Sequence, residues 1–133
     1  MEINKILKLG VIALLLDSIY LSITKKYFDK LVYKIQGDNL VVNMKGAIIS
    51  YSLIIFSLYY FIIKDGKKPI DAFFLGLSIY GIYDGTNIAI FKNYDSYIAY
   101  VDMIWGATLY ALTTSLFNLD YIPRLSFINL EGE

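Results

Sequence analysis

Four long apolar stretches, separated by short polar segments, run along almost the whole chain. They cover about residues 6–24, 46–63, 69–91 and 97–121. Each is about 18–25 residues long, the length that a helix needs to cross roughly 30 Å of hydrocarbon. The chain is 57% hydrophobic, with a mean hydropathy of +0.54, which is too apolar for an ordinary soluble domain of 133 residues. We therefore predict an all-α integral membrane protein, a four-helix bundle that forms a single transmembrane domain over residues 1–133.

The polar segment between the first two stretches, residues 25–43, has a helical pattern of its own. Phe28, Leu31 and Ile35 recur in it at helical spacing, and lysines occupy another face. A Gly-Asp pair, which is typical of a turn, follows this pattern. We predict a short amphipathic helix that lies in the membrane interface, with a plain polar connector as the alternative.

The charged residues do not fix the orientation of the spans. Four spans would make the protein multi-pass, with both termini on the same side of the bilayer. Six lysines or arginines fall on each side, so the positive-inside rule does not determine which side that is. Pro123 and Arg124 are expected to close the fourth span, and the last ten residues, with Glu131 and Glu133, to form a short solvated tail.

Composition also narrows the chemistry. The chain has no cysteine and no histidine, which excludes disulfides, thiolate or histidine-based catalysis and His-ligated zinc or haem within this chain. Its net charge is zero and it has no basic aromatic stripe, so we expect no nucleic-acid partner. The abundance of Lys, Ile, Asn and Tyr fits an AT-rich genome, such as that of a large DNA virus or a low-GC bacterium.

Three aspartates, Asp17, Asp84 and Asp102, interrupt the apolar stretches. A carboxylate near the centre of a span costs roughly 2.5–3.5 kcal/mol on insertion scales, so such residues face a bundle interior and mark candidate functional sites. Asp17 and Asp84 each precede the end of their span by seven residues, and Asp102 follows the start of its span by five. At about 1.5 Å per residue, all three lie about 7–11 Å below the same membrane face. We therefore predict that the three carboxyl groups meet at one level of an antiparallel bundle.

Polar and small residues share the helix faces that carry these aspartates. By helical spacing, the faces also hold Tyr20, Tyr80, Asn87, Trp105 and Gly106. The second span offers Ser50 and Tyr51 at matching depth, and Lys45 is the one cation able to reach down to a carboxylate. Gly81 and Gly85 form a small-xxx-small pair, which lets another helix approach closely.

Three clustered carboxyl groups could not all remain ionised in a low-dielectric bundle without compensation. A shared proton, the Lys45 ammonium group, hydrogen bonds from Tyr and Asn, or a bound cation would each supply that compensation. We predict a proton or cation pocket formed by Asp17, Asp84, Asn87 and Asp102. Its oxygen ligands would suit a hard divalent cation such as Mg²⁺, Ca²⁺ or Mn²⁺, although the sequence requires no cofactor and identifies no metal. The alternative is structural: protonated aspartates that bond to Tyr, Trp and Asn across helices and fix the packing.

Three short motifs resemble those of a family of small four-span membrane proteins, the domain of unknown function 2177 (DUF2177). They are L-D-S-I-Y-L at residues 16–21, Y-D-G-T-N at residues 83–87 and D-M-I-W-G at residues 102–106. The similarity covers residue 6 to about residue 119, and Tyr20 stands where bacterial members have a tryptophan. The resemblance implies the four-span topology but no activity. It marks as motif positions Asp17, Asp84, Thr86, Asn87, Asp102, Trp105 and Gly106.

These observations favour an integral membrane protein whose buried acidic pocket handles protons or a small cation. Its partners would be the lipid bilayer and either further copies of the chain or another membrane protein. A non-catalytic structural component of a cellular or viral membrane is one alternative. A metal-dependent enzyme that acts on a lipid or isoprenoid is another, and it is less favoured because no reaction motif or catalytic residue can be assigned.

Overall fold

The computed structural model describes residues 3–131, and the side chains of residues 3–119. The described residues form four α-helices and one short π-helical segment, without a β-strand. These elements are α1 (Ile3–Gln36), α2 (Met44–Leu58), the π-helical η1 (Tyr59–Ile63), α3 (Pro69–Ile90) and α4 (Ser96–Glu131). The predicted all-α, four-helix class is confirmed.

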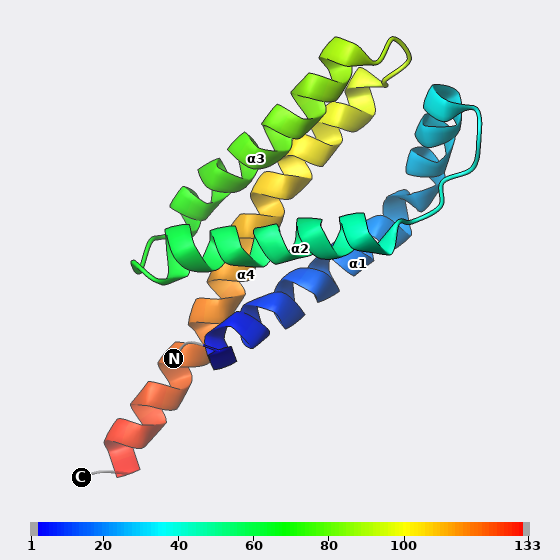
Figure 1. Cartoon of the computed structure of the whole chain (residues 1–133). Coiled ribbons are helices and arrows are strands. Elements are labelled where there is room, and N and C mark those ends of the chain that lie inside the picture. The colour runs from blue at the N-terminus through cyan, green and yellow to red at the C-terminus, as the bar shows by residue number, and fades with distance from the viewer. Residues whose placement is uncertain (1–2, 132–133) are drawn as a thin grey trace.

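The first span and the helical part of the predicted interfacial segment form one continuous helix, α1. The expected separate helix over residues 25–43 is therefore not present; residues 25–36 extend α1, and Gly37 ends it with φ of 71°. The polar residues after the span are good helix formers, so no local signal stops the helix before this glycine. Figure 1 shows that the last part of α1 turns away from the first. Hydroxyl groups of Ser18, Ser22 and Thr24 bond back to the preceding turn, and such bonds often bend helices.

The boundaries of the second and third helices agree closely with the predicted spans. Asn43 caps α2, because its side-chain oxygen accepts hydrogen bonds from two backbone N–H groups of the first turn. Helix α2 continues directly into η1, and the two together form the α2–η1 rod. In η1 the N–H of Lys64 donates to the carbonyl of Tyr59, five residues back. Pro69 opens α3 at a position where a missing N–H costs nothing.

The fourth helix is longer than predicted. We expected closure at Pro123 and a solvated tail, but the backbone of α4 is helical to Glu131. A proline removes one backbone donor and disturbs the turn before it, yet a helix can continue, with a bend, on both sides of it. The side chains of residues 120–131, including Arg124 and Glu131, lie outside the described residues, and so does the whole of Glu133.

The bundle has two ends, the loop end and the turn end. The loop end holds residues 37–43 and 91–95; the turn end holds residues 64–68 and lies near the start of α1 (Figure 1). In the same view α3 and α4 run side by side, and α1 contacts both α4 and α2. At the turn end, an apolar cluster joins α2, η1, α3 and α4 through Leu58, Ile62, Ala72 and Tyr110.

Two glycines make the close contact between α3 and α4. A Cβ atom on Gly76 would lie 2.4 Å from the carbonyl oxygen of Gly106, and a Cβ atom on Gly106 would lie 2.0 Å from the ring of Tyr80. Both distances are far below van der Waals contact, so only glycine fits at these positions. The helix pair that carries Asp84 and Asp102 is therefore held at short range by backbone-to-backbone and ring-to-backbone contact.

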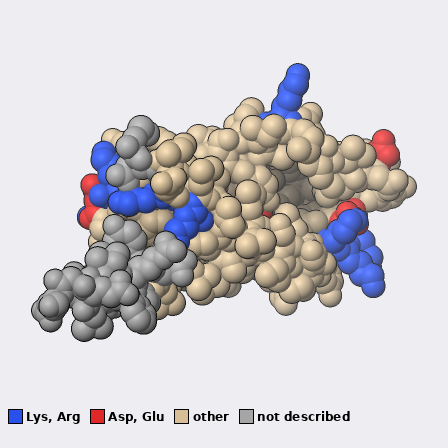
Figure 2. All heavy atoms as spheres, turned by 90° about the horizontal axis from the view of Figure 1, so that it is seen from below, with Lys and Arg blue, Asp and Glu red and all other residues tan. Residues whose placement is uncertain are grey.

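The outer surface is apolar where a bilayer would surround it. Large apolar side chains stay exposed along α1 and α2, among them Leu7, Leu15, Ile23, Ile48 and Leu53. Figure 2 shows charged side chains gathered toward the ends of one face, with a broad band between them that is almost free of Lys, Arg, Asp and Glu. Among the described residues, α1 and the α2–η1 rod are long and apolar enough to cross a membrane. In α3 and α4, polar groups such as Asp84 and Asp102 lower the hydropathy.

Candidate functional site

The three aspartates within the apolar stretches are all buried. The exposed fraction of the side chain is 7% for Asp17, 0% for Asp84 and 7% for Asp102. They come from α1, α3 and α4, and aromatic donors or another carboxyl group surround each of them. An isolated buried carboxyl group is costly, so its hydrogen-bond partners determine what it can do.

Asp17 is held by donors from two other helices. The hydroxyl group of Tyr51 on α2 donates to Asp17 Oδ2, and the indole N–H of Trp105 on α4 donates to Asp17 Oδ1 at 2.9 Å. Both carboxyl oxygens therefore have a donor. These two hydrogen bonds tie α1, α2 and α4 together.

Asp102 is linked to Asp17 through a pair of stacked rings. Tyr20, one helical turn beyond Asp17 on α1, donates its hydroxyl group to Asp102 Oδ1 at 3.2 Å. Its ring stacks on Trp105, with 4.6 Å between centroids and 11° between planes. The two rings thus pack together while one donates to Asp102 and the other to Asp17, which fixes both donors in place.

Asp84 is bound on one oxygen only. Tyr94, from the connection between α3 and α4, donates its hydroxyl group to Asp84 Oδ1 at 3.1 Å. The same hydroxyl oxygen accepts a hydrogen bond from Asn87 Nδ2 at 3.4 Å. No N–H or O–H donor of the described residues reaches Asp84 Oδ2, which is fully buried. The neighbour of this carboxyl group is Asp102, with which it interacts directly.

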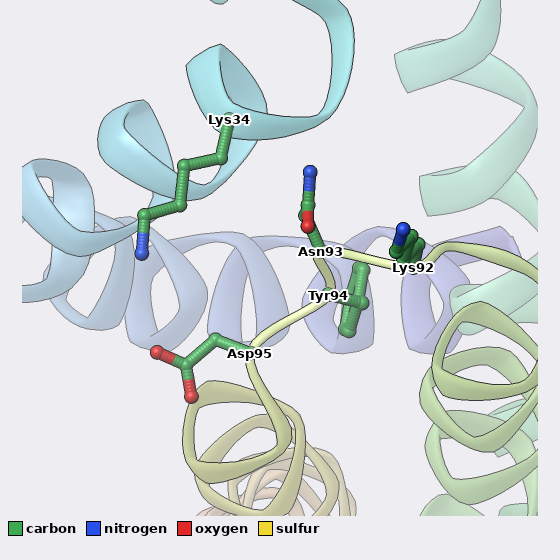
Figure 3. A pocket seen from close by; sticks show the side chains of 5 residues that line it. All are labelled: Lys34, Lys92, Asn93, Tyr94 and Asp95. Carbon is green, nitrogen blue, oxygen red and sulfur yellow. The ribbon is translucent and has the colours of Figure 1, made fainter.

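Tyr94 also connects the buried carboxyl groups with the loop end. It lines a shallow hollow of about 450 Å³ together with Lys34, Lys92, Asn93 and Asp95. Figure 3 shows these side chains on the α3–α4 connection and on the last turns of α1. Burial raises the pKa of the Tyr94 phenol above its usual value, so this hydroxyl group keeps its proton and remains a donor at neutral pH. One residue therefore contacts both the hollow and Asp84.

The structure brings most, but not all, of the predicted site residues together. The acidic network, as we name it, consists of Asp17, Tyr20, Tyr51, Asp84, Asn87, Tyr94, Asp102 and Trp105. Tyr80 lies beside it, packed on Gly106 with its ring edge toward Tyr110.

Three predicted supporting residues lie away from this network. Lys45, Ser50 and Thr86 are exposed, and no ion pair between Lys45 and an aspartate occurs in the described part of the chain. Lys45 belongs to the first turn of α2, where its backbone N–H bonds to Asn43. Of the sources of compensation that we considered, the described residues use hydrogen bonds from tyrosine and not the Lys45 ammonium group.

Of the three glycines that were predicted to pack against another helix, one does so in the described structure and two do not. Gly106 packs against Tyr80, as expected of a helix-packing residue. Gly81 and Gly85 have open space beside them, and no described part of another helix packs against them. Their role in helix packing stays a prediction. The glycine that pairs with Gly106 is Gly76, which the small-xxx-small spacing did not single out.

Sequence reasoning missed the role of Tyr94 as well. Tyr94, Tyr97 and Tyr100 all fit an aromatic belt by position, and the last two are indeed exposed. Tyr94 points inward instead. Its distance of three residues from the end of the span and its place after the Lys92-Asn93 turn are the only signals that it could fold back.

Most of the carboxyl oxygens of the three aspartates already have a hydrogen-bond donor. No group of three or more ligating carboxyl, thiol or imidazole side chains among the described residues is close enough to hold a metal ion. Four of the six carboxyl oxygens already accept hydrogen bonds from Tyr or Trp. What the site offers is two adjacent carboxyl groups in a setting shielded from water.

Fold and site together define a helical membrane protein with a buried acidic network. A family model described as a predicted membrane protein, DUF2177, matches residues 3–118. The chain belongs to this family, and the resemblance seen in its three motifs is confirmed. No curated protein and no solved structure matches the chain.

Proposed function

We propose that the acidic network handles protons or a small cation at a site buried within the bilayer. The observation that carries the proposal is the Asp84 carboxyl group, which is fully buried, bound by one donor on one oxygen, and adjacent to a second carboxyl group. Two adjacent carboxylates without a cation between them repel each other strongly in a low dielectric. A positively charged species that binds there removes this repulsion.

The proposed topology has four spans, with both termini on the side of the turn end. Figure 1 supports it, because the start of α1, the α2–α3 turn and the last part of α4 lie toward one end and the two other connections toward the opposite end. The site then lies nearer the loop end, and Tyr94 connects it with that side.

Flux measurements in proteoliposomes test the proposed function. We expect Asp84→Asn and Asp102→Asn to abolish pH-driven or cation-driven flux, and Asp17→Asn to reduce it, because each changes the charge of the network. Asp65→Asn, in the exposed turn between η1 and α3, is the matched control and should leave flux unchanged. The proposal is wrong if all three variants in the network transport protons, Na⁺ and Mg²⁺ at the wild-type rate.

A structural membrane component is the second candidate, and the hydrogen bonds of Asp17 favour it. Both oxygens of this carboxyl group bond to other helices, so Asp17 joins three helices without any bound ion. If the network serves only this purpose, the same three variants should lower the melting temperature or disturb assembly while flux stays at the background level of empty liposomes.

A further inference from the structure

We propose that Asp84 and Asp102 share a single proton, and that this proton is the species that the site binds. The inference rests on the proposed function and narrows it, because it selects a proton over a metal ion. It assigns the proton to one pair of carboxyl groups among the three.

The first argument is the distribution of donors over the carboxyl oxygens. Asp17 has a donor on each oxygen, whereas Asp84 and Asp102 have one identified donor each, both on Oδ1. The two groups that are short of donors are therefore the two that interact directly. One proton bound between them would give each group a second hydrogen-bond interaction and would reduce the charge of the pair from −2 to −1.

The second argument is the unpartnered oxygen itself. Two buried side-chain oxygens lack a partner in the described part of the chain, Thr113 Oγ1 and Asp84 Oδ2. The threonine hydroxyl is neutral, and its hydrogen can rotate toward a nearby acceptor. The carboxyl oxygen has no hydrogen of its own unless the group is protonated, and an unsatisfied buried charge is the more costly of the two. A proton shared with Asp102 would satisfy this atom.

The third argument is the chemistry of the surrounding groups. The titratable side chains that face the pair are Asp17 and Tyr20 from α1, Tyr80 from α3 and Tyr94 from the α3–α4 connection. Tyr51 from α2 contacts Asp17 and not the pair. No lysine or arginine of the described residues forms an ion pair with either partner. A metal ion would have to compete with the hydroxyl hydrogens for the lone pairs of Oδ1, whereas a proton needs only the two remaining oxygens.

Infrared difference spectroscopy of the purified protein in lipid nanodiscs tests the proposal. The readout is the C=O stretch of a protonated carboxyl group at neutral pH, identified by its shift on exchange into D₂O. We expect one such band in the wild-type protein and its complete loss in Asp84→Asn and in Asp102→Asn. Either amide can donate N–H to the remaining carboxylate, so neither variant needs the proton. Asp65→Asn should keep the band. Circular dichroism confirms that each variant retains the helix content.

Titration of the same samples with Na⁺ and Mg²⁺ separates this inference from the proposed function. The shared proton is supported if the wild-type band persists at saturating salt. If either ion removes the band and binds with a stoichiometry that depends on Asp84 and Asp102, the shared proton is overturned but cation handling stands. If the wild-type protein has no such band and binds neither ion, both proposals fail. A band that both variants retain also overturns the assignment of the proton to Asp84 and Asp102. Where a variant does not fold, the spectra of the wild-type protein with and without Na⁺ and Mg²⁺ decide the outcome.

Discussion

The two ends of the bundle are built from different interactions. Toward the loop end, aromatic hydroxyl and indole groups bind three buried aspartates; at the turn end, Leu58, Ile62 and Ala72 pack around Tyr110. The turn-end cluster contains a polar pair as well, Ser57 and Tyr110, whose hydroxyl groups lie 2.6 Å apart and satisfy each other. The acidic network, in contrast, contains a fully buried carboxyl oxygen, Asp84 Oδ2, that no donor of the described residues reaches. The comparison teaches that the helices are joined in two ways: by apolar packing at the turn end, and by buried polar groups toward the loop end.

The glycine contact at the boundary of the two regions gives the largest expected effect. Gly106→Leu would place a side chain where the Tyr80 ring lies, and no small shift relieves a Cβ contact of 2.0 Å. We expect a loss of more than about 3 kcal/mol, at or beyond the upper limit for overpacking, because α3 and α4 must separate. Thermal unfolding in nanodiscs measures it. Gly85→Leu, which enters open space in this chain, is the matched control. Equal melting temperatures for the two variants would contradict the close contact.

A cavity in the turn-end cluster should cost stability but not binding. Leu58 is fully buried among Ile62, Ala72 and Tyr110, so Leu58→Ala should destabilise the protein by about 2–5 kcal/mol. The infrared band of the protonated carboxyl group in the acidic network should stay unchanged at temperatures where the variant is folded. Loss of the band in Leu58→Ala would show that the turn-end cluster and the acidic network are not independent.

Removal of one donor to Asp17 should have a smaller effect on stability and should sharpen the distinction within the acidic network. Tyr51→Phe leaves Asp17 Oδ2 without a hydrogen bond, for which we expect a loss of about 1–3 kcal/mol. The proton between Asp84 and Asp102 should remain, because Asp17 is not part of that pair. Infrared spectra and thermal unfolding of one preparation give both values. Loss of the wild-type band in this variant would mean that Asp17 belongs to the proton site.

The smallest expected change in stability follows from Tyr94→Phe. The variant keeps the ring and removes one half-buried hydroxyl donor, so we expect a loss of about 1 kcal/mol. Tyr94 contacts both the outer hollow and Asp84. We therefore expect the rate of hydrogen–deuterium exchange of the carboxyl proton to change clearly, although the melting temperature changes little. Tyr97→Phe, on an exposed tyrosine of the same end, is the control. Equal exchange rates in Tyr94→Phe and the wild type would contradict a route through Tyr94.

The sequence alone predicted the helices and the residues of the acidic network better than their exact contacts. Hydropathy located the four helices, and Pro69 marked the start of α3, because both signals act locally. The equal depth of Asp17, Asp84 and Asp102 indicated that they belong together. Spacing could not show which flank of α3 faces α4, so it selected Gly81 and Gly85 rather than Gly76. That choice depends on the rotation of each helix about its axis, which the fit of all the side chains determines.

The inward position of Tyr94 was not predictable for a related reason. A tyrosine in a short connection can lie at the membrane surface or fold back onto the bundle, and the local sequence is compatible with both. A hydrogen bond to the buried carboxyl group of Asp84 stabilises the second position, but this group is contributed by another part of the chain. The position of Lys45, one of the compensating groups that we considered, was not predictable either, since a lysine at a helix start can remain in water.

Solid-state carbon-13 NMR of aspartate-labelled protein in lipid bilayers tests the convergence of the aspartates most directly. We expect a through-space cross-peak between the carboxyl carbons of Asp84 and Asp102, which both single Asn variants identify by its disappearance. A second, weaker correlation should place Asp17 beside Trp105, with the indole N–H bound to its carboxyl group. Carboxyl carbons of Asp84 and Asp102 without any mutual contact, each in contact with lipid chains or water instead, would contradict the acidic network itself.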